Sequence, residues 1–142
     1  MTSRGVVVAV DVGTVRVGVA ASDPRRVLAS PVETVPAPGL QRVAEIVAER
    51  SAVLVVVGLP TSLSGRATSA SATMAQDWAA ELEHLVPVPV ELVDERLTTA
   101  TATAALRSAG KKGKQARSLV DQAAAVALLQ SVLDRRSRPE PP

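Results

Sequence analysis

Two runs of branched apolar residues end in acidic side chains, and these runs constrain the fold more than any other feature of the sequence. The first run, Val6–Asp11, closes on its own acid, and the second, Val88–Val93, is followed by Asp94 and Glu95. Continuous β-branched runs of this length are typical of buried strands. In an open α/β sheet, ligands bind outside the carboxyl ends of the strands. The acids at these two strand ends are therefore expected to border one crevice.

The rest of the chain alternates between strand patterns and helix patterns. The expected strands are Val6–Asp11, Arg16–Ser22, Val27–Val35, Ala52–Gly58 and Val88–Val93, and the expected helices are Leu40–Arg50, Ala72–Leu85, Leu97–Ser108 and Leu119–Arg135. An antiparallel meander of three strands followed by βαβ crossovers predicts an α/β fold, a mixed sheet with two further parallel strands and helices on both faces. Pro31 lies inside the third strand and predicts an edge position for it, because proline cannot donate to a strand ladder.

Length and composition limit the remaining possibilities. With 142 residues the chain is expected to form one domain over residues 1–136, followed by a charged, proline-rich and disordered tail over residues 137–142. The absence of cysteine excludes disulfides, thiolate metal sites and thiol nucleophiles. No apolar segment reaches the length of a membrane span and no signal-peptide pattern is present, so we expect a cytoplasmic protein without a membrane partner.

Aromatic residues are nearly absent, which limits how a nucleic acid could be held. Trp78 is the single aromatic residue, and its helical spacing from Met74 and Leu82 predicts a core position, whereas His84 is expected at the surface. Recognition of a nucleic acid would rely on phosphates, sugars and shape rather than on stacked bases. Residues 107–142 carry eight basic and three acidic residues, so a net charge of +5 lies in this third and −3 in the remainder. A polyanion is expected to approach the C-terminal third, although a solvated surface would show the same charge.

The segment after the first strand, Asp11-Val-Gly13-Thr-Val-Arg16, combines a strand-end carboxylate with a glycine turn. Such a turn lets a metal-bound phosphate approach the backbone closely, and Arg16 is a candidate phosphate contact. The same pattern opens the phosphate-binding hairpin of the actin, sugar-kinase and heat-shock ATPase group. By itself it therefore does not separate an ATPase from a nuclease. The ATPase is the weaker hypothesis, because that architecture needs a second domain.

Asp94-Glu95-Arg96 forms the second motif. Side chains alternate in direction along a strand, so only one of the two acids needs to face the crevice. We favour Glu95 over Asp94 as the acid on the metal side. Arg96 could pair with the neighbouring acid or grip a phosphate. An acid–base turn at the surface is the simpler alternative for this motif taken alone.

Asp121 is the third candidate acid, near the start of the last expected helix. The spacing of Ser118 and Asp121 also matches a helix N-terminal capping box. The two roles are compatible, because the dipole of a first helical turn keeps an acid ionised. Small residues after Asp121, among them Ala124 and Ala125, would let the helix pack close to the sheet.

The segment Ala109–Arg117 is expected to be a basic loop just before Asp121. Its basic residues are Lys111, Lys112, Lys114 and Arg117. Such residues position a nucleic acid through phosphate contacts without reading its sequence. A solvated run of charge is the alternative.

Three converging carboxylates repel one another unless a cation lies between them. Oxygen-rich sites of this kind suit Mg²⁺ or Mn²⁺. The candidate site is therefore expected to support metal-dependent phosphodiester chemistry.

Four segments taken together resemble the YqgF family, also called RuvX, over about residues 5–135. The segments are the Asp11–Ala20 hairpin, Val57-Gly58-Leu59-Pro60, Asp94–Thr99, and Asp121 with the two alanines after Gln122. The resemblance implies a ribonuclease H-like fold, a relationship to the Holliday-junction resolvase RuvC and a cytosolic role in 5′-end maturation of 16S rRNA. It also implies that Asp11, Glu95 and Asp121 are the active-site acids.

Three functional alternatives remain at this point. The first is a metal-dependent endonuclease acting on structured RNA within the ribosome precursor, as a monomer or a weak homodimer. The second is a Holliday-junction resolvase acting on branched DNA, which would work as a dimer because it cuts two strands symmetrically. The third is an RNA-binding ribosome-assembly factor without catalytic activity.

Overall fold

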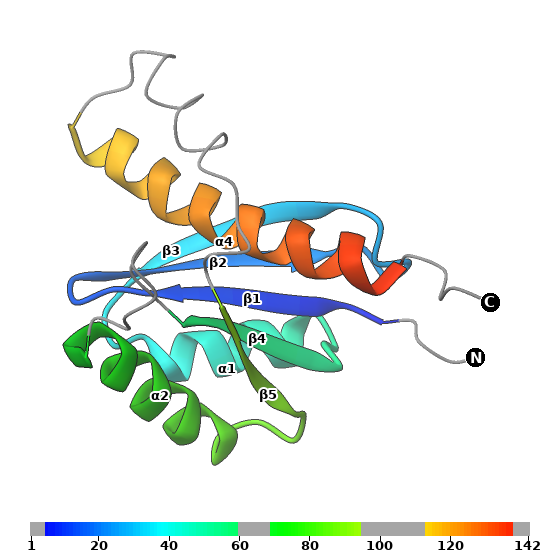
Figure 1. The fold of residues 1–142 in the computed structure, drawn as a ribbon, viewed down its shortest axis with the longest axis horizontal. Helices are drawn as coiled ribbons and strands as arrows, with labels where there is room; N and C mark the ends of the chain where they lie inside the picture. The colour runs from blue at the N-terminus through cyan, green and yellow to red at the C-terminus, as the bar shows by residue number, and fades with distance from the viewer. Residues whose placement is uncertain (1–4, 60–68, 95–112, 138–142) are drawn as a thin grey trace.

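A computed structural model of the chain describes residues 5–59, 69–94 and 113–137. Within these ranges five strands form one sheet, flanked by three helices (Figure 1). The strands are β1 (Val7–Val12), β2 (Arg16–Ser22), β3 (Ala29–Pro36), β4 (Leu54–Leu59) and β5 (Val90–Asp94). The helices are α1 (Leu40–Glu49), α2 (Ser69–Glu83) and α4 (Gly113–Ser137). The expected helix Leu97–Ser108 and the tail from residue 138 onward lie outside the described residues.

The strand order is β3-β2-β1-β4-β5. Strands β1, β2 and β3 form an antiparallel meander, while β4 is parallel to β1 and β5 is parallel to β4. The expected mixed sheet is thus confirmed. The edge position expected for the strand with Pro31 is also confirmed, because β3 lies at the end of the sheet. Pro31 pairs with Ala20 just where the β2–β3 register shifts by one residue.

Each face of the sheet has its own hydrophobic core, because successive side chains of a strand point to opposite faces. Val8 and Val10 of β1 pack with α1 and α2, whereas Val7 and Ala9 pack with α4. Figure 1 shows α4 crossing the sheet on one side and α1 and α2 on the other. Trp78 belongs to the first core, as expected: it is 4% exposed, and its indole N–H donates to the carbonyl of Pro38 at 2.6 Å.

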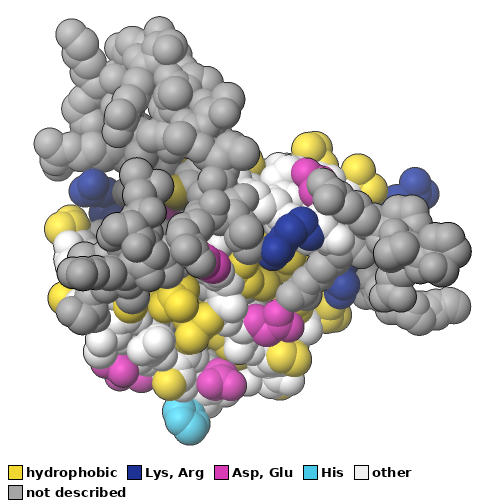
Figure 2. All heavy atoms as spheres, in the orientation of Figure 1, with side chains coloured by type: hydrophobic (Ala, Val, Ile, Leu, Met, Phe, Trp, Pro, Cys, Tyr) yellow, Lys and Arg dark blue, Asp and Glu magenta, His cyan; other side chains and the backbone are white. Residues whose placement is uncertain are grey.

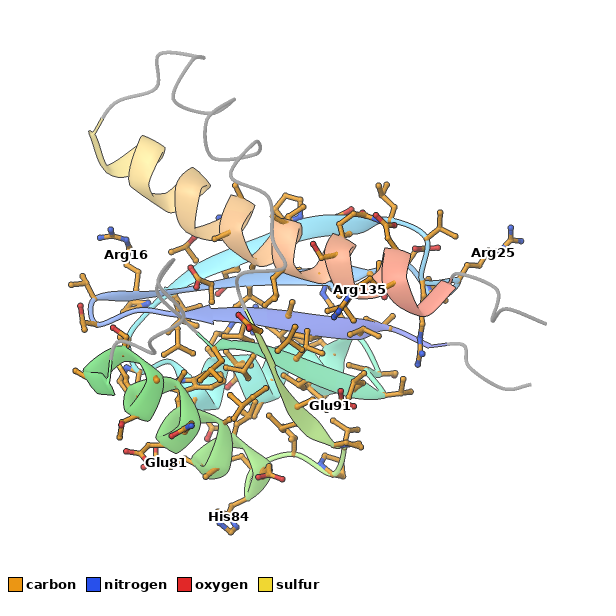
Figure 3. The ribbon with its side chains drawn as sticks, viewed as in Figure 1. Arg16, Arg25, Glu81, His84, Glu91 and Arg135 are labelled. Carbon is orange, nitrogen blue, oxygen red and sulfur yellow. The ribbon has the colours of Figure 1, made fainter. Side chains whose placement is uncertain are left out.

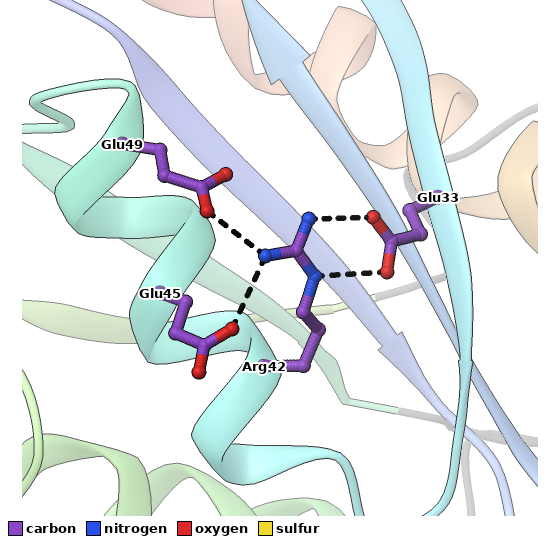
Figure 4. Close-up of polar contacts among 4 residues, drawn as sticks. All are labelled: Glu33, Arg42, Glu45 and Glu49. Atoms are coloured by element: carbon purple, nitrogen blue, oxygen red, sulfur yellow. Dashed lines mark hydrogen bonds and ion pairs between the residues drawn. The ribbon is translucent and has the colours of Figure 1, made fainter.

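An ion cluster joins α1 to the edge strand β3 (Figure 4). Arg42 donates through Nε and Nη2 to both carboxylate oxygens of Glu33, at 2.9 and 2.8 Å. Its Nη1 contacts Glu45 at 3.2 Å and Glu49 at 3.0 Å. Hydrogen bonding to Arg42 lowers the pKa of Glu33, and hydrogen bonding to Glu33 raises the pKa of Arg42. The cluster links α1 to the edge strand β3 through side chains that remain partly exposed.

The turn between β2 and β3 is longer than the expected strand bounds indicated. Strand β3 begins at Ala29, two residues later than expected, because Asp23 organises the preceding residues into a turn. The carboxylate of Asp23 accepts the backbone N–H groups of Arg25, Val27 and Leu28 at 3.2, 2.8 and 2.9 Å. These hydrogen bonds lower the pKa of Asp23, with that of Leu28 contributing most.

The start of the last helix was placed wrongly by the sequence pattern. Helix α4 begins at Gly113, six residues before the expected Leu119. Lys114 and Arg117 are therefore helical rather than part of a loop. The physical reason is that the residues directly after Gly113 are good helix formers, so the helix begins at this glycine instead of after the basic segment. Ser118 and Asp121 consequently lie in the helix interior, so the capping-box interpretation is wrong.

No helix within the described ranges combines the length and the apolar character needed to cross a membrane.

Candidate active site at the carboxyl edge of the parallel strands

Asp11 and Asp94 reach the same edge of the sheet, because β1, β4 and β5 are parallel. Val10 pairs with Val57, and Asp94 pairs with Leu59, so Asp11 and Asp94 lie within about one residue of the same position along the strand direction. Strand β4 lies between β1 and β5, so the two acids are separated by two strand spacings, roughly 10 Å. The parallel strands thus bring Asp11 and Asp94 to the same end of the sheet.

Asp11 and Asp94 nevertheless belong to opposite faces. Asp11 follows Val7 and Ala9 in the alternation of β1 and so lies on the face that α4 covers. In β5 it is Val93 that packs into the α4 core, at 8% exposure. The next residue, Asp94, therefore belongs to the face of α1 and α2. Glu95 itself lies outside the described residues.

Two glycines flank Asp11 within the sheet. Asp11 pairs with Gly18 of β2. On its other side, one residue beyond the Val10–Val57 pair, stands Gly58 of β4, which itself pairs with Val93. Neither neighbour carries a side chain that could fill the space beside the Asp11 carboxylate. The side chain of Asp11 is thus flanked by two glycines on the face that α4 covers.

Helix α4 crosses the sheet at the level of Asp11. Thr34 of β3 pairs with Gly18, which pairs with Asp11, so the three residues form one row across the sheet. The side chain of Gln122 donates from Nε2 to the hydroxyl of Thr34 at 3.0 Å. The residue before it, Asp121, lies in the third turn of α4 rather than in the first turn. The expected role of a first-turn helix dipole therefore does not apply to Asp121, since that effect is confined to the terminal turn.

The β1–β2 turn confirms the need for glycine after Asp11. Strand β1 ends at Val12 and β2 begins at Arg16. A Cβ added to Gly13 would stand 2.6 Å from the carbonyl oxygen of Arg16, closer than real Cβ contacts allow. Space, rather than an unusual backbone angle, selects glycine here. The side chain of Arg16 extends away from this end of the sheet in Figure 3.

The other candidate nucleic-acid contacts are only partly described. Arg96, Lys111 and Lys112 lie outside the described residues. Lys114 and Arg117 occupy the first turns of α4, and the structure gives the course of the helix there but not their side chains. Among the described residues, no three acidic or histidine side chains gather in a way that could hold a metal ion. That set includes neither Glu95 nor the side chain of Asp121.

Acidic side chains mark a part of the surface that a nucleic acid would avoid. Figure 2 shows acidic and apolar side chains together on the half of this face formed by α2 and β5. Asp77, Glu81 and Glu83 are exposed there, and so is His84, as expected from the sequence (Figure 3). Like charges repel a phosphate backbone, so the α4 side of the sheet is the more favourable approach.

The arrangement defines a class of protein. An antiparallel three-strand meander continued by two parallel strands, with helices on both faces and an acid on the first strand, is a ribonuclease H-like fold. The RuvX family model, described as Holliday junction resolvase, matches residues 5–135. The chain therefore belongs to the RuvX family.

Relatives with about half of their residues identical cover nearly the whole chain. A protein of Rhodococcus opacus strain B4 is 51% identical over 144 residues, which cover 95% of this chain and 80% of that protein. A protein of Mycobacteroides abscessus is 52% identical over 141 residues, with coverages of 95% and 84%. Both carry the name "Putative pre-16S rRNA nuclease".

Solved structures agree on the fold. RuvC of Thermus thermophilus in complex with a Holliday junction substrate superposes with a TM-score of 0.58 at 18% identity, covering 93% of this chain and 96% of that chain. A further Thermus thermophilus RuvC structure gives 0.57 at 17% identity, with coverages of 92% and 95%. At these identities the likeness supports the shared architecture.

Proposed function

We propose that this protein is a metal-dependent endonuclease that acts in 5′-end maturation of pre-16S rRNA, with Asp11, Glu95 and Asp121 as its active-site acids. The observation that carries the proposal is the position of Asp11, at the carboxyl edge of the parallel strands, between two glycines and beneath α4. Membership of the RuvX family and the names of the relatives support the reaction and the substrate. Such a substrate makes the ribosome precursor the partner and the cytoplasm the site of action.

The alternation of β5 supports Glu95 as the second acid. Val93 packs on the α4 face and Asp94 belongs to the opposite face. In a strand that continued its alternation past Asp94, the next side chain would belong to the face that carries Asp11. We therefore retain Glu95 rather than Asp94 as the acid directed to the metal.

The periodicity of α4 supports Asp121 as the third acid. Ala125, Leu128, Leu129 and Val132 are buried against the sheet. Position 121 lies one turn before Ala125 and two turns before Leu128, so it shares the helix face that packs on the sheet. Because Ala125 is small, as are Ala9 and Ala20 in the sheet below, the helix approaches closely.

The donor chemistry of these residues fits Mg²⁺ or Mn²⁺, which prefer carboxylate oxygens. Asp11, Glu95 and Asp121 would hold the ion, which when bound activates water and stabilises charge on the attacked phosphate. Gly18 and Gly58 carry no side chain that would compete with the ion for the space beside Asp11. Arg16, Arg96, Lys111, Lys112, Lys114 and Arg117 would hold the phosphate backbone through charge-assisted contacts.

The test compares the wild type with Asp11→Asn on a pre-16S rRNA fragment in the presence of Mn²⁺ or Mg²⁺. We expect Asp11→Asn to abolish cleavage while RNA binding and the fold are retained. Asp23→Asn is the matched control, because Asp23 also follows a strand end but lies at the opposite end of the sheet. Unchanged metal-dependent cleavage by Asp11→Asn would remove the proposed role.

A Holliday-junction resolvase is the second candidate, and the description of the family model favours it. Resolution requires two symmetric cuts and hence a dimer. A four-way DNA junction offered beside the rRNA fragment separates the two activities, and light scattering gives the oligomeric state. Preferred junction cleavage by a dimer would replace the rRNA proposal. RNA binding without metal-dependent turnover would instead support an assembly factor.

A further inference from the structure

We infer that Gln122 and Thr34 form a positioning pair that sets the placement of Asp121 over the row of Asp11. The inference rests on the proposed function, since it concerns the geometry of the same acids. The pair connects α4 to the edge strand β3 through residues 88 positions apart in the sequence. It does so at the level of the sheet where Asp11 stands.

The pair attaches α4 to the sheet near the middle of the helix, and Gln130 attaches it about two turns closer to its C-terminus. Gln130 accepts the backbone N–H of Ala29 at 2.9 Å and donates to the carbonyl of Val27 at 3.0 Å. Gln122 and Gln130 lie on one i, i+4 row of the helix, with Val126 between them. Both contact the β3 side of the sheet. Two attachments on one row hold the helix against rotation about its own axis.

Rotation of α4 would matter most for an acid at position 121. Side chains extend about 5–6 Å from a helix axis, so a rotation of about 10° moves a carboxylate by about 1 Å. Displacements of that size can cost about a hundredfold in rate when reacting groups must be aligned. Gln122 adjoins position 121, whereas Gln130 is more than two turns away. The Gln122–Thr34 bond is therefore the attachment that controls the acid, while Gln130 contributes to general stability.

The hydroxyl of Thr34 is the chemical requirement on the strand side. It accepts the amide hydrogen of Gln122 and can still donate its own hydrogen, because a hydroxyl both donates and accepts. Valine at this position would keep the shape of the side chain and remove the acceptor. Serine would keep the acceptor, so the two substitutions separate hydrogen bonding from packing.

The experiment measures Mn²⁺ binding by calorimetry, and cleavage of the rRNA fragment at saturating Mn²⁺, for four variants of the full chain. We expect Gln122→Ala and Thr34→Val each to weaken Mn²⁺ binding and to slow cleavage by about tenfold or more. Thr34→Ser should remain close to wild type. Gln130→Ala is the matched control. It should lower the melting temperature about as much as Gln122→Ala does, while its Mn²⁺ binding and cleavage stay within about twofold of the wild type.

The double variant Gln122→Ala/Thr34→Val adds a test of the bond itself. If the two residues act through one hydrogen bond, the double variant loses little more than either single variant. Normal Mn²⁺ binding and cleavage by Gln122→Ala would overturn the inference, as would equal losses in Gln130→Ala. Failure of the proposed function is distinguishable, because the wild type itself would then show no Mn²⁺-dependent cleavage, or Asp11→Asn would keep it.

Discussion

The two faces of the sheet are filled in contrasting ways. The face under α1 and α2 is packed with large side chains such as Ile46, Trp78 and Leu82. The face under α4 also buries large side chains, Leu128 and Leu129, but along the row of Asp11 its strands present Gly18 and Gly58. Large side chains maximise the apolar area removed from water, and small ones leave space beside the acid. Both faces therefore contribute to the core, and the α4 face differs in the glycines that flank Asp11.

The two faces should respond differently when one residue on each is changed. If Asp11 holds the metal as proposed, Asp11→Asn should lower rRNA cleavage by about 10³-fold or more, while the melting temperature stays near that of the wild type. Steady-state cleavage and a thermal melt on the same preparation check both parts. A large loss of stability in this variant would show that Asp11 is a structural residue.

Leu82→Ala tests the other face. Leu82 is fully buried, and its truncation should destabilise the protein by about 2–5 kcal/mol through lost transfer energy and a residual cavity. Urea denaturation gives the free energy of unfolding. Cleavage measured well below the melting temperature should match the wild type, and a specific loss of rate in the folded protein would contradict the division between faces.

Added metal should stabilise the folded protein. Mn²⁺ at about a hundred times its dissociation constant should stabilise the wild type by about 2.7 kcal/mol if it binds the native state alone. Chelation by EDTA should reverse the rise in melting temperature. Leu82→Ala should gain the same stabilisation from Mn²⁺, although its melting temperature without metal is lower. If Asp11→Asn gained this stabilisation too, the metal would bind elsewhere.

The ion cluster around Arg42 predicts a smaller effect. Arg42 and Glu33 are about one-third exposed, at 35% and 34%, so solvent screens their attraction. Arg42→Met keeps the aliphatic stem and should lower the melting temperature by less than Leu82→Ala. The difference from the wild type should shrink at high salt, because salt screens the three remaining carboxylates from one another. A salt-independent difference would assign the loss to packing.

The turn at Asp23 predicts the smallest effect and a specific pH dependence. Hydrogen bonds from the backbone lower the pKa of Asp23 in the folded state, so its contribution to stability is present above the ordinary pKa of about 4. That contribution is lost as the pH falls through the lowered pKa. Melting temperatures between pH 7 and pH 3 should fall more steeply for the wild type than for Asp23→Asn. Parallel curves would show that Asp23 does not contribute.

Much of the fold follows from local patterns in the sequence. The runs around Val8 and Val56 are β-branched and uninterrupted, so they identify strands without reference to the rest of the chain. Pro31 predicts the edge strand for an equally local reason, the missing N–H group. Asp11 is recognisable because a strand and a glycine turn flank it directly.

The remaining features depend on contacts that the local pattern does not encode. The start of α4 was missed because glycine and lysine before Leu119 fit a loop as well as a helix. The Gln122–Thr34 bond joins residues 88 positions apart, and the glycine row around Asp11 exists only in the observed register. The sequence shows that Gln122 is adjacent to Asp121, but it does not show that Thr34 is the hydrogen-bond partner of Gln122.

The burial of Trp78 has a consequence for how the molecule can be observed. The chain has no tyrosine and no phenylalanine, so this indole is the sole intrinsic fluorophore. The Trp78 side chain extends from α2 to the carbonyl of Pro38, in the core on the side of the sheet away from α4. Emission would therefore stay constant while α4 detached, and a fluorescence melt would describe half of the molecule. Hydrogen exchange along Ala125–Leu133 would instead follow the unfolding of α4, which contains no fluorophore.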